Sequence, residues 1–177
     1  MKKLFLFAVL VIFASSCATV NLTFNKNPEY HGRVKKIFIL LKDIKKTGFV
    51  SQLSLDLPAA LQENGIDAKA ILVDGLTLEN EKDFHKMATD FSADAVITVE
   101  RAFDNIGASK YGNYYSGGFY VVSLTPFGAE KPVWKANIDT DFEYKNPSKI
   151  SKRATNQLIV ELLNADLLSP KVSEKMN

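Results

Sequence analysis

Few residues of this chain have the types and spacing that nucleophilic catalysis requires. A serine nucleophile of the α/β-hydrolase type lies in a G-x-S-x-G turn between a strand and a helix. The nearest string, Tyr115-Ser116-Gly117-Gly118, lacks the leading glycine and is followed by a strand pattern. Lys46-Thr47-Gly48 matches one fragment of the motif set of penicillin-recognising serine enzymes, but no S-x-x-K precedes it to supply the nucleophile. The sequence therefore does not predict a serine enzyme.

Metal binding and acid–base chemistry also lack a clustered set of side chains. The two histidines, His31 and His85, are far apart, and neither H-x-x-x-H nor C-x-x-C occurs. Asp139 and Asp141 lie two residues apart on the solvent-facing side of a strand pattern and could bind a cation or serve acid–base chemistry, but we interpret them as solubilising residues. We therefore predict no catalytic residue, no metal and no cofactor, and we interpret the chain as non-enzymatic.

The only cysteine, Cys17, has a clear chemical interpretation. Lys2 and Lys3 are followed by an unbroken apolar run over residues 4–13 and by the small residues Ala14-Ser15-Ser16. A basic start, a short apolar segment and a small-residue cleavage site are typical of a secretory signal peptide. Ten helical residues span about 15 Å, half of a ~30 Å hydrocarbon core, so the run is too short for a permanent transmembrane helix.

The end of this signal resembles a bacterial lipobox, in which a small residue precedes a cysteine that receives diacylglycerol. Leucine is usual where Ala14 stands, and glycine or alanine where Ser16 stands. The resemblance implies cleavage before Cys17 and a membrane anchor through lipid on Cys17; acylation also explains an unpaired thiol in an exported chain. Ala18, which is not aspartate, favours the outer membrane facing the periplasm by similarity to the enterobacterial sorting pattern. The alternative is an ordinary secreted protein with an incidental cysteine.

Charge and composition exclude a nucleic-acid partner. The chain has 22 basic and 20 acidic residues, and Lys2 and Lys3 leave with the signal, so the mature chain has 20 of each. Nucleic-acid-binding proteins usually have a basic surplus in a clustered patch. A hydrophobic fraction of 46% and a charged fraction of 24% are typical of a globular domain. We expect a signal peptide at 1–16, the lipidated cysteine and a tether at 17–33 with a short strand at 20–24, one domain at 34–168, and a tail at 169–177.

The hydrophobic pattern predicts the elements of that domain. Short apolar or alternating runs predict strands at 36–41, 66–73, 94–103, 119–125 and 133–142. Apolar residues at helical spacing predict helices at 49–64, 80–91 and 146–168. Pro58 requires the first helix either to bend there or to begin there. The expected core consists of one apolar face from each element, namely Ile37, Ile39, Leu61, Phe84, Phe91, Val96, Trp134, Ile138 and Leu158.

The predicted order β-α-β-α-β-β-β-α indicates an α/β (α+β) fold with a mixed sheet of about five strands and helices packed on it. This order, with the hairpin VVSLTPFGAEKPVWKANI and a terminal amphipathic helix, resembles the curli-secretion lipoprotein and the amino-terminal domain of TolB. The resemblance spans residues 33–168 and implies a periplasmic lipoprotein domain. The long amphipathic insertion that the curli-type channel needs is absent from the sequence, which argues against a secretion channel.

The segment 105–118 (NIGASKYGNYYSGG) is predicted to be a long loop, and it holds four of the nine glycines and three of the six tyrosines. Tyrosine offers apolar area with a polar tip, so Tyr111, Tyr114 and Tyr115 are candidates for contacts with a partner; a structural role is the alternative. We interpret the chain as a lipid-anchored accessory or binding subunit of an envelope assembly, with an envelope protein as its partner. An envelope hydrolase or a small-ligand-binding protein is the alternative function.

Overall fold

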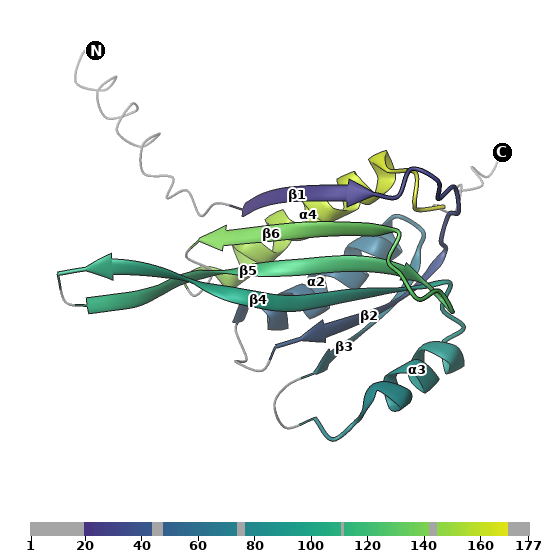
Figure 1. Cartoon of the computed structure of the whole chain (residues 1–177), viewed down its shortest axis with the longest axis horizontal. Coiled ribbons are helices and arrows are strands. Elements are labelled where there is room, and N and C mark those ends of the chain that lie inside the picture. Colours follow the sequence, from purple (N-terminus) through teal and green to yellow (C-terminus); the bar gives the residue numbers. More distant parts are fainter. Residues whose placement is uncertain (1–19, 44–47, 74–76, 111, 142–144, 170–177) are drawn as a thin grey trace, which may run out of the picture.

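The computed structural model describes residues 20–43, 48–73, 77–110, 112–141 and 145–169, which form one mixed sheet with helices on both faces (Figure 1). The sheet order is β1-β6-β5-β4-β2-β3. The parallel half consists of β2 (Lys36–Lys42), β3 (Asp67–Val73) and β4 (Ala95–Ser109). The antiparallel half adds β5 (Gly112–Pro126), β6 (Trp134–Asp141) and β1 (Val20–Lys26). The predicted fold class is confirmed, with six strands in place of about five.

The additional strand is β1, which covers the short strand expected at 20–24 and pairs with β6 at the edge of the sheet. Much of the segment 17–33 that was predicted as a tether is therefore part of the sheet. Phe24 on β1 stacks on Trp134 of β6, with ring centroids 6.4 Å apart. This contact attaches β1 to the core.

The main core lies between the sheet and two helices, α2 (Gly48–Glu63) and α4 (Pro147–Asn164), which pack against each other. Phe49, Leu53, Leu57 and Leu61 of α2 recur at intervals of four residues and are fully buried. The helix runs through Pro58, so the alternative in which it begins there is wrong. The helix ends at Glu63, and Gly65 follows with a φ of 76°, a conformation that glycine adopts readily. In the described residues, no helix has the length and apolar character needed to cross a bilayer.

Among the described helices, α3 (Glu81–Asp90) is the one that covers the other face of the sheet. Six of the nine predicted core residues are fully buried in the main core: Ile37, Ile39, Leu61, Trp134, Ile138 and Leu158. Phe91 and Val96 are partly buried and pack against a second, smaller core cluster on the α3 face, and Phe84 is partly buried on α3. A ten-residue helix is too small to cover this face, so apolar side chains there keep some contact with solvent.

The segment 105–118 is not a loop. Residues 105–109 continue β4 and residues 112–118 belong to β5, and together they form a long antiparallel hairpin that projects from the body of the domain (Figure 1). Two register shifts, between Arg101 and Phe103 and between Asn105 and Ile106, interrupt the pairing near its base. Such bulges disturb the period-two alternation that identifies a strand in a sequence, which explains why a loop was predicted.

Candidate binding site: a groove on the α3 face

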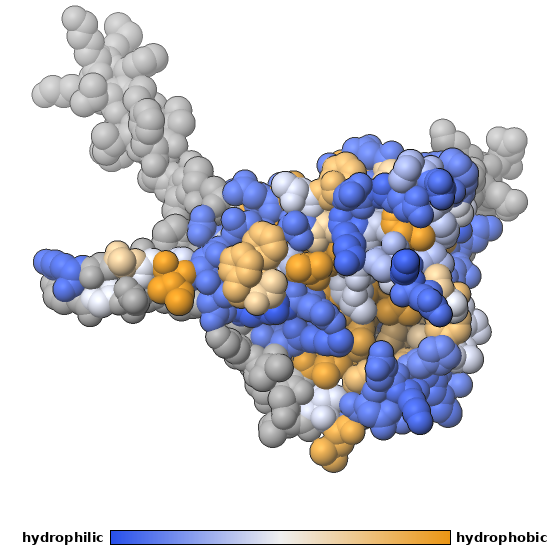
Figure 2. Space-filling model, in the orientation of Figure 1, coloured by the Kyte–Doolittle hydropathy of each residue, from blue (hydrophilic) through white to orange (hydrophobic). Residues whose placement is uncertain are grey.

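An open groove of about 610 Å³ lies between α3, the sheet and the turn after β5. Its floor is apolar: Phe38 and Leu40 of β2 are buried, and Val96 of β4 is partly buried. These side chains belong to the face of β2 and β4 opposite the main core, because successive residues of a strand point to opposite faces. Figure 2 shows apolar surface in the hollow between α3 and the sheet.

The first turn of α3 is positioned by a capping box. The side chain of Asn80 accepts hydrogen bonds from the backbone N–H groups of Lys82 and Asp83, and Asp83 accepts one from the N–H of Asn80. This exchange satisfies backbone donors that a helix start otherwise leaves free. At the other end, the carboxylate of Asp90 lies 2.7 Å from the ammonium of Lys86 and raises the pKa of that group. Both contacts support a helix of only ten residues.

The second half of α3 is held on the sheet by aromatic contacts. Phe91 lies 6.5 Å from Phe38, centroid to centroid, and the ammonium of Lys36 lies 4.7 Å from the centroid of the Phe91 ring. Ala88 is buried between the helix and the sheet. These contacts fix one wall of the groove.

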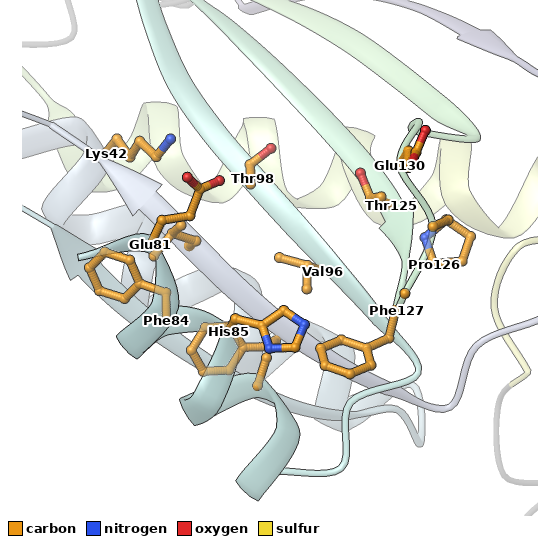
Figure 3. A pocket seen from close by; sticks show the side chains of 15 residues that line it. Lys42, Glu81, Phe84, His85, Val96, Thr98, Thr125, Pro126, Phe127 and Glu130 are labelled. Carbon is orange, nitrogen blue, oxygen red and sulfur yellow. The ribbon is translucent and has the colours of Figure 1, made fainter. Parts of the chain in front are cut away.

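The opposite wall is the turn that follows β5. The imidazole of His85 on α3 faces the ring of Phe127 in this turn at 5.0 Å between centroids, so the two walls approach each other over the floor (Figure 3). The rim carries the carboxylates of Glu81 and Glu130, both exposed. The one lysine at the rim, Lys42, is paired with Glu100. Counted over the described residues alone, the rim has a net negative charge.

This arrangement is suited to binding an apolar group. The hydroxyl of Thr98 is 2.6 Å from that of Ser123, so these polar side chains satisfy each other. Within the described residues, no group of three or more histidine, cysteine, aspartate or glutamate side chains could hold a metal ion. An apolar floor with few polar groups at its edges is typical of a binding site for an apolar segment or ligand.

No family model matches the chain, and no curated protein matches it. The chain does, however, match solved structures. The chain shares its fold with PelC. A PelC dodecamer from Paraburkholderia phytofirmans is 13% identical, with a TM-score of 0.54, over 81% of this chain and 97% of that one. A PelC variant from the same organism gives a TM-score of 0.50 at 13% identity, over 82% and 98% of the two chains. A lipoprotein from Neisseria meningitidis is also 13% identical, with a TM-score of 0.42, over 73% and 98%.

The likeness to PelC supports the α+β fold, and the resemblance to the curli-secretion lipoprotein and the TolB domain stays a prediction. Two of the residues singled out in the sequence, Cys17 and Tyr111, lie outside the described residues. Tyr114 and Tyr115 lie in β5, opposite Gly107 and Ile106 of β4, about one sheet length away from the groove. The structure therefore does not bring Tyr114 and Tyr115 to the groove.

Of the two acidic residues on β6, Asp139 and Asp141, the first has a structural role. Asp139 accepts a hydrogen bond of 2.6 Å from the side-chain amide of Asn105 on β4, which ties β6 to the base of the long hairpin. His85 is exposed and also lines the groove. Sequence analysis missed the groove. The available signal was Phe38, Leu40 and Val96, because apolar residues on both faces of a strand require a cover on each.

Proposed function

We propose that the protein is a lipid-anchored subunit of an envelope assembly, held to the outer membrane on its periplasmic side by lipid on Cys17. Its role is to bind an apolar segment of an envelope protein, without catalysis, in the groove on the α3 face. The apolar floor of that groove is the observation that carries the proposal. The signal sequence before Cys17 supports export and anchoring.

Charge and volume define the segment that the groove accepts. The carboxylates of Glu81 and Glu130 flank the apolar floor, so a segment with basic residues on either side of an apolar centre is complementary. The PelC structures that share this fold are dodecamers. This supports a role in an assembly, in which the bound segment belongs either to another copy or to a different subunit.

Site-specific photocrosslinking in intact cells tests this function. We expect a photoreactive phenylalanine analogue in place of His85 to crosslink to a protein, because this side chain faces the groove. Phe127→Asp puts a charge into the groove wall and should abolish the crosslink. The control Leu55→Asp lies on α2, where Leu55 is 65% exposed, and should leave the crosslink intact. A crosslink that survives Phe127→Asp in a folded protein contradicts the proposal.

A small apolar ligand is the second candidate, since about 610 Å³ lies within the range of ligand pockets, ~300–1,000 Å³. The same variants separate the two functions. If the groove binds a ligand, mass spectrometry of the purified protein will show a small molecule that Phe127→Asp displaces, and the photoreactive group will form no protein crosslink.

A further inference from the structure

The long hairpin projects from the end of the sheet at which the chain enters β1. Val20 pairs with Thr140, Thr140 with Gly118, and Gly118 with Asp104, so these four residues form one row across four strands. We call the hairpin from Phe103 to Phe119 the arm. Beyond the row, β4 continues for five residues to Ser109, which extends the arm by about 17 Å at ~3.4 Å per residue.

The arm exposes apolar side chains to solvent. Phe103 is 55% exposed and stacks on Phe119 with 4.6 Å between ring centroids and 7° between ring planes. Ile106, farther along, is 67% exposed. Figure 2 shows this apolar surface on the projecting part of the molecule. An apolar cluster that a folded domain leaves in contact with solvent is a candidate contact surface.

The charge of the arm narrows the choice of partner. Asp104, at the base of the arm, is paired with Arg101 at 2.7 Å, and from residue 105 to 118 the sequence contains no acidic residue and one basic residue, Lys110. Three tyrosines, Tyr111, Tyr114 and Tyr115, lie in the same short segment. Aromatic residues and lysine, without acids, are the composition of protein segments at the interface between a bilayer and water, where anionic headgroups attract cations.

The short chain between Cys17 and β1 limits how far the lipid anchor can lie from the sheet. Cys17 precedes Val20 by three residues, so a fully extended chain at ~3.6 Å per residue keeps it within about 11 Å of the row that begins at Val20. The arm extends about 17 Å beyond that row. The arm therefore extends at least about 6 Å beyond the farthest position that Cys17 can take in that direction, which is far enough to meet the headgroup layer of a bilayer that holds the anchor.

We propose that the arm docks on the lipid bilayer, with Phe103, Ile106 and Phe119 in the headgroup layer beside the acylated Cys17. This inference rests on the lipid anchor of the proposed function. Phe103 and Phe119 lie one residue behind the row and Ile106 two residues beyond it, so these side chains reach lipid when the strands are tilted and the arm lies along the surface. The anchor and the arm together then orient the domain on the membrane.

Quenching by brominated phospholipids tests the docking. Full-length lipidated protein is purified in detergent and reconstituted into vesicles of phosphatidylethanolamine and phosphatidylglycerol that contain a phospholipid brominated near the headgroup. Ile106→Trp places a reporter on the arm, and Ala108→Trp is a second variant in case the first does not fold. Lys131→Trp, exposed in the turn at the opposite end of the sheet, is the matched control. The native Trp134 is buried and gives a constant background.

We expect quenching in the arm variants at least about twofold stronger than in the control, because only the arm reaches the interface. Equal quenching in a protein that carries lipid on Cys17, shown by its intact mass, overturns the docking and leaves the anchor standing. A blue-shifted but unquenched reporter also overturns it and assigns the arm to another copy or a protein partner. An intact mass without lipid overturns both the anchor and the docking.

Discussion

Replacement of Trp134 is the most direct test of how β1 and β6 are joined to the core. The indole is 1% exposed at the start of β6 and stacks on Phe24 of β1. Loss of a buried aromatic side chain typically costs about 3–5 kcal/mol, so we expect Trp134→Ala to lower the free energy of unfolding by that amount. For a domain of this size, 1 kcal/mol corresponds to about 2–4 °C, which gives a decrease in Tm of about 6–20 °C.

Trp134→Phe should behave differently, because the buried indole Nε1 has no hydrogen-bond partner among the described residues. An unsatisfied buried donor costs about 1–3 kcal/mol, and phenylalanine removes it. The smaller ring gives up about 1–2 kcal/mol of burial, at ~0.8 kcal/mol per methylene equivalent. The two effects nearly cancel, so we expect a change within about 1 kcal/mol of zero.

Urea and thermal unfolding, followed by far-ultraviolet circular dichroism in detergent, measure both variants. Equal slopes of unfolding free energy against urea would show that the change lies in stability and not in the extent of unfolding. An alanine variant within about 1 kcal/mol of the parent would refute the packing role assigned to this ring. A phenylalanine variant as unstable as the alanine variant would refute the unsatisfied donor.

Three other predictions concern the anchor and the arm. Cys17→Ser should release the protein from membranes or block its maturation, and the native mature chain should begin at Cys17 with the mass of an attached lipid, as fractionation and mass spectrometry can show. Replacement of Tyr111, Tyr114 and Tyr115 of the arm with serine should leave thermal unfolding near that of the parent, while contact with the partner or membrane is lost. A large drop in Tm with contacts retained would mean that these tyrosines support the fold. Gly117→Ala should destabilise the domain by about 2 kcal/mol or more, because a Cβ would lie 1.8 Å from the carbonyl oxygen of Thr140; Ala108→Ser, on an exposed part of the arm, is the control in the same unfolding assay.

The main core could be predicted from the sequence because each of its elements carries an unambiguous period. Leu53, Leu57 and Leu61 repeat every four residues, and Trp134 and Ile138 belong to a strict alternation. Such patterns determine which face of an element is apolar, and two helices on one face of a sheet cover it fully. For these elements, local pattern and tertiary burial agree.

The α3 face could not be predicted in the same way. The stripe of Phe84 and Phe91 correctly indicates an apolar side of a helix, but no local pattern records that the helix is too short to cover the sheet beneath it. Val96 is only partly buried for the same reason, because α3 does not cover it completely. The groove is therefore a property of the size of α3 and of the position of the Phe127 turn, which are set by tertiary packing.

The arm was missed for a different reason. Glycine is disfavoured in strands, and four of the fourteen residues from 105 to 118 are glycine. In the structure at least one of these glycines is required by close packing: Gly117 lies against the backbone of β6 at Thr140, where a side chain would not fit. The glycine-rich composition that is typical of a mobile loop is here needed for a hairpin whose backbone packs closely against β6.

The groove and the arm lie at opposite ends of the same sheet, and this separation has a consequence for the proposed function. Val96, in the floor of the groove, precedes Asp104, at the base of the arm, by eight residues on β4, or about 27 Å at ~3.4 Å per residue. If the arm and Cys17 both contact the bilayer, the Phe127 end of the groove points away from the membrane. A periplasmic segment then reaches the groove without competing with lipid, so one sheet can hold the membrane at one end and a partner at the other.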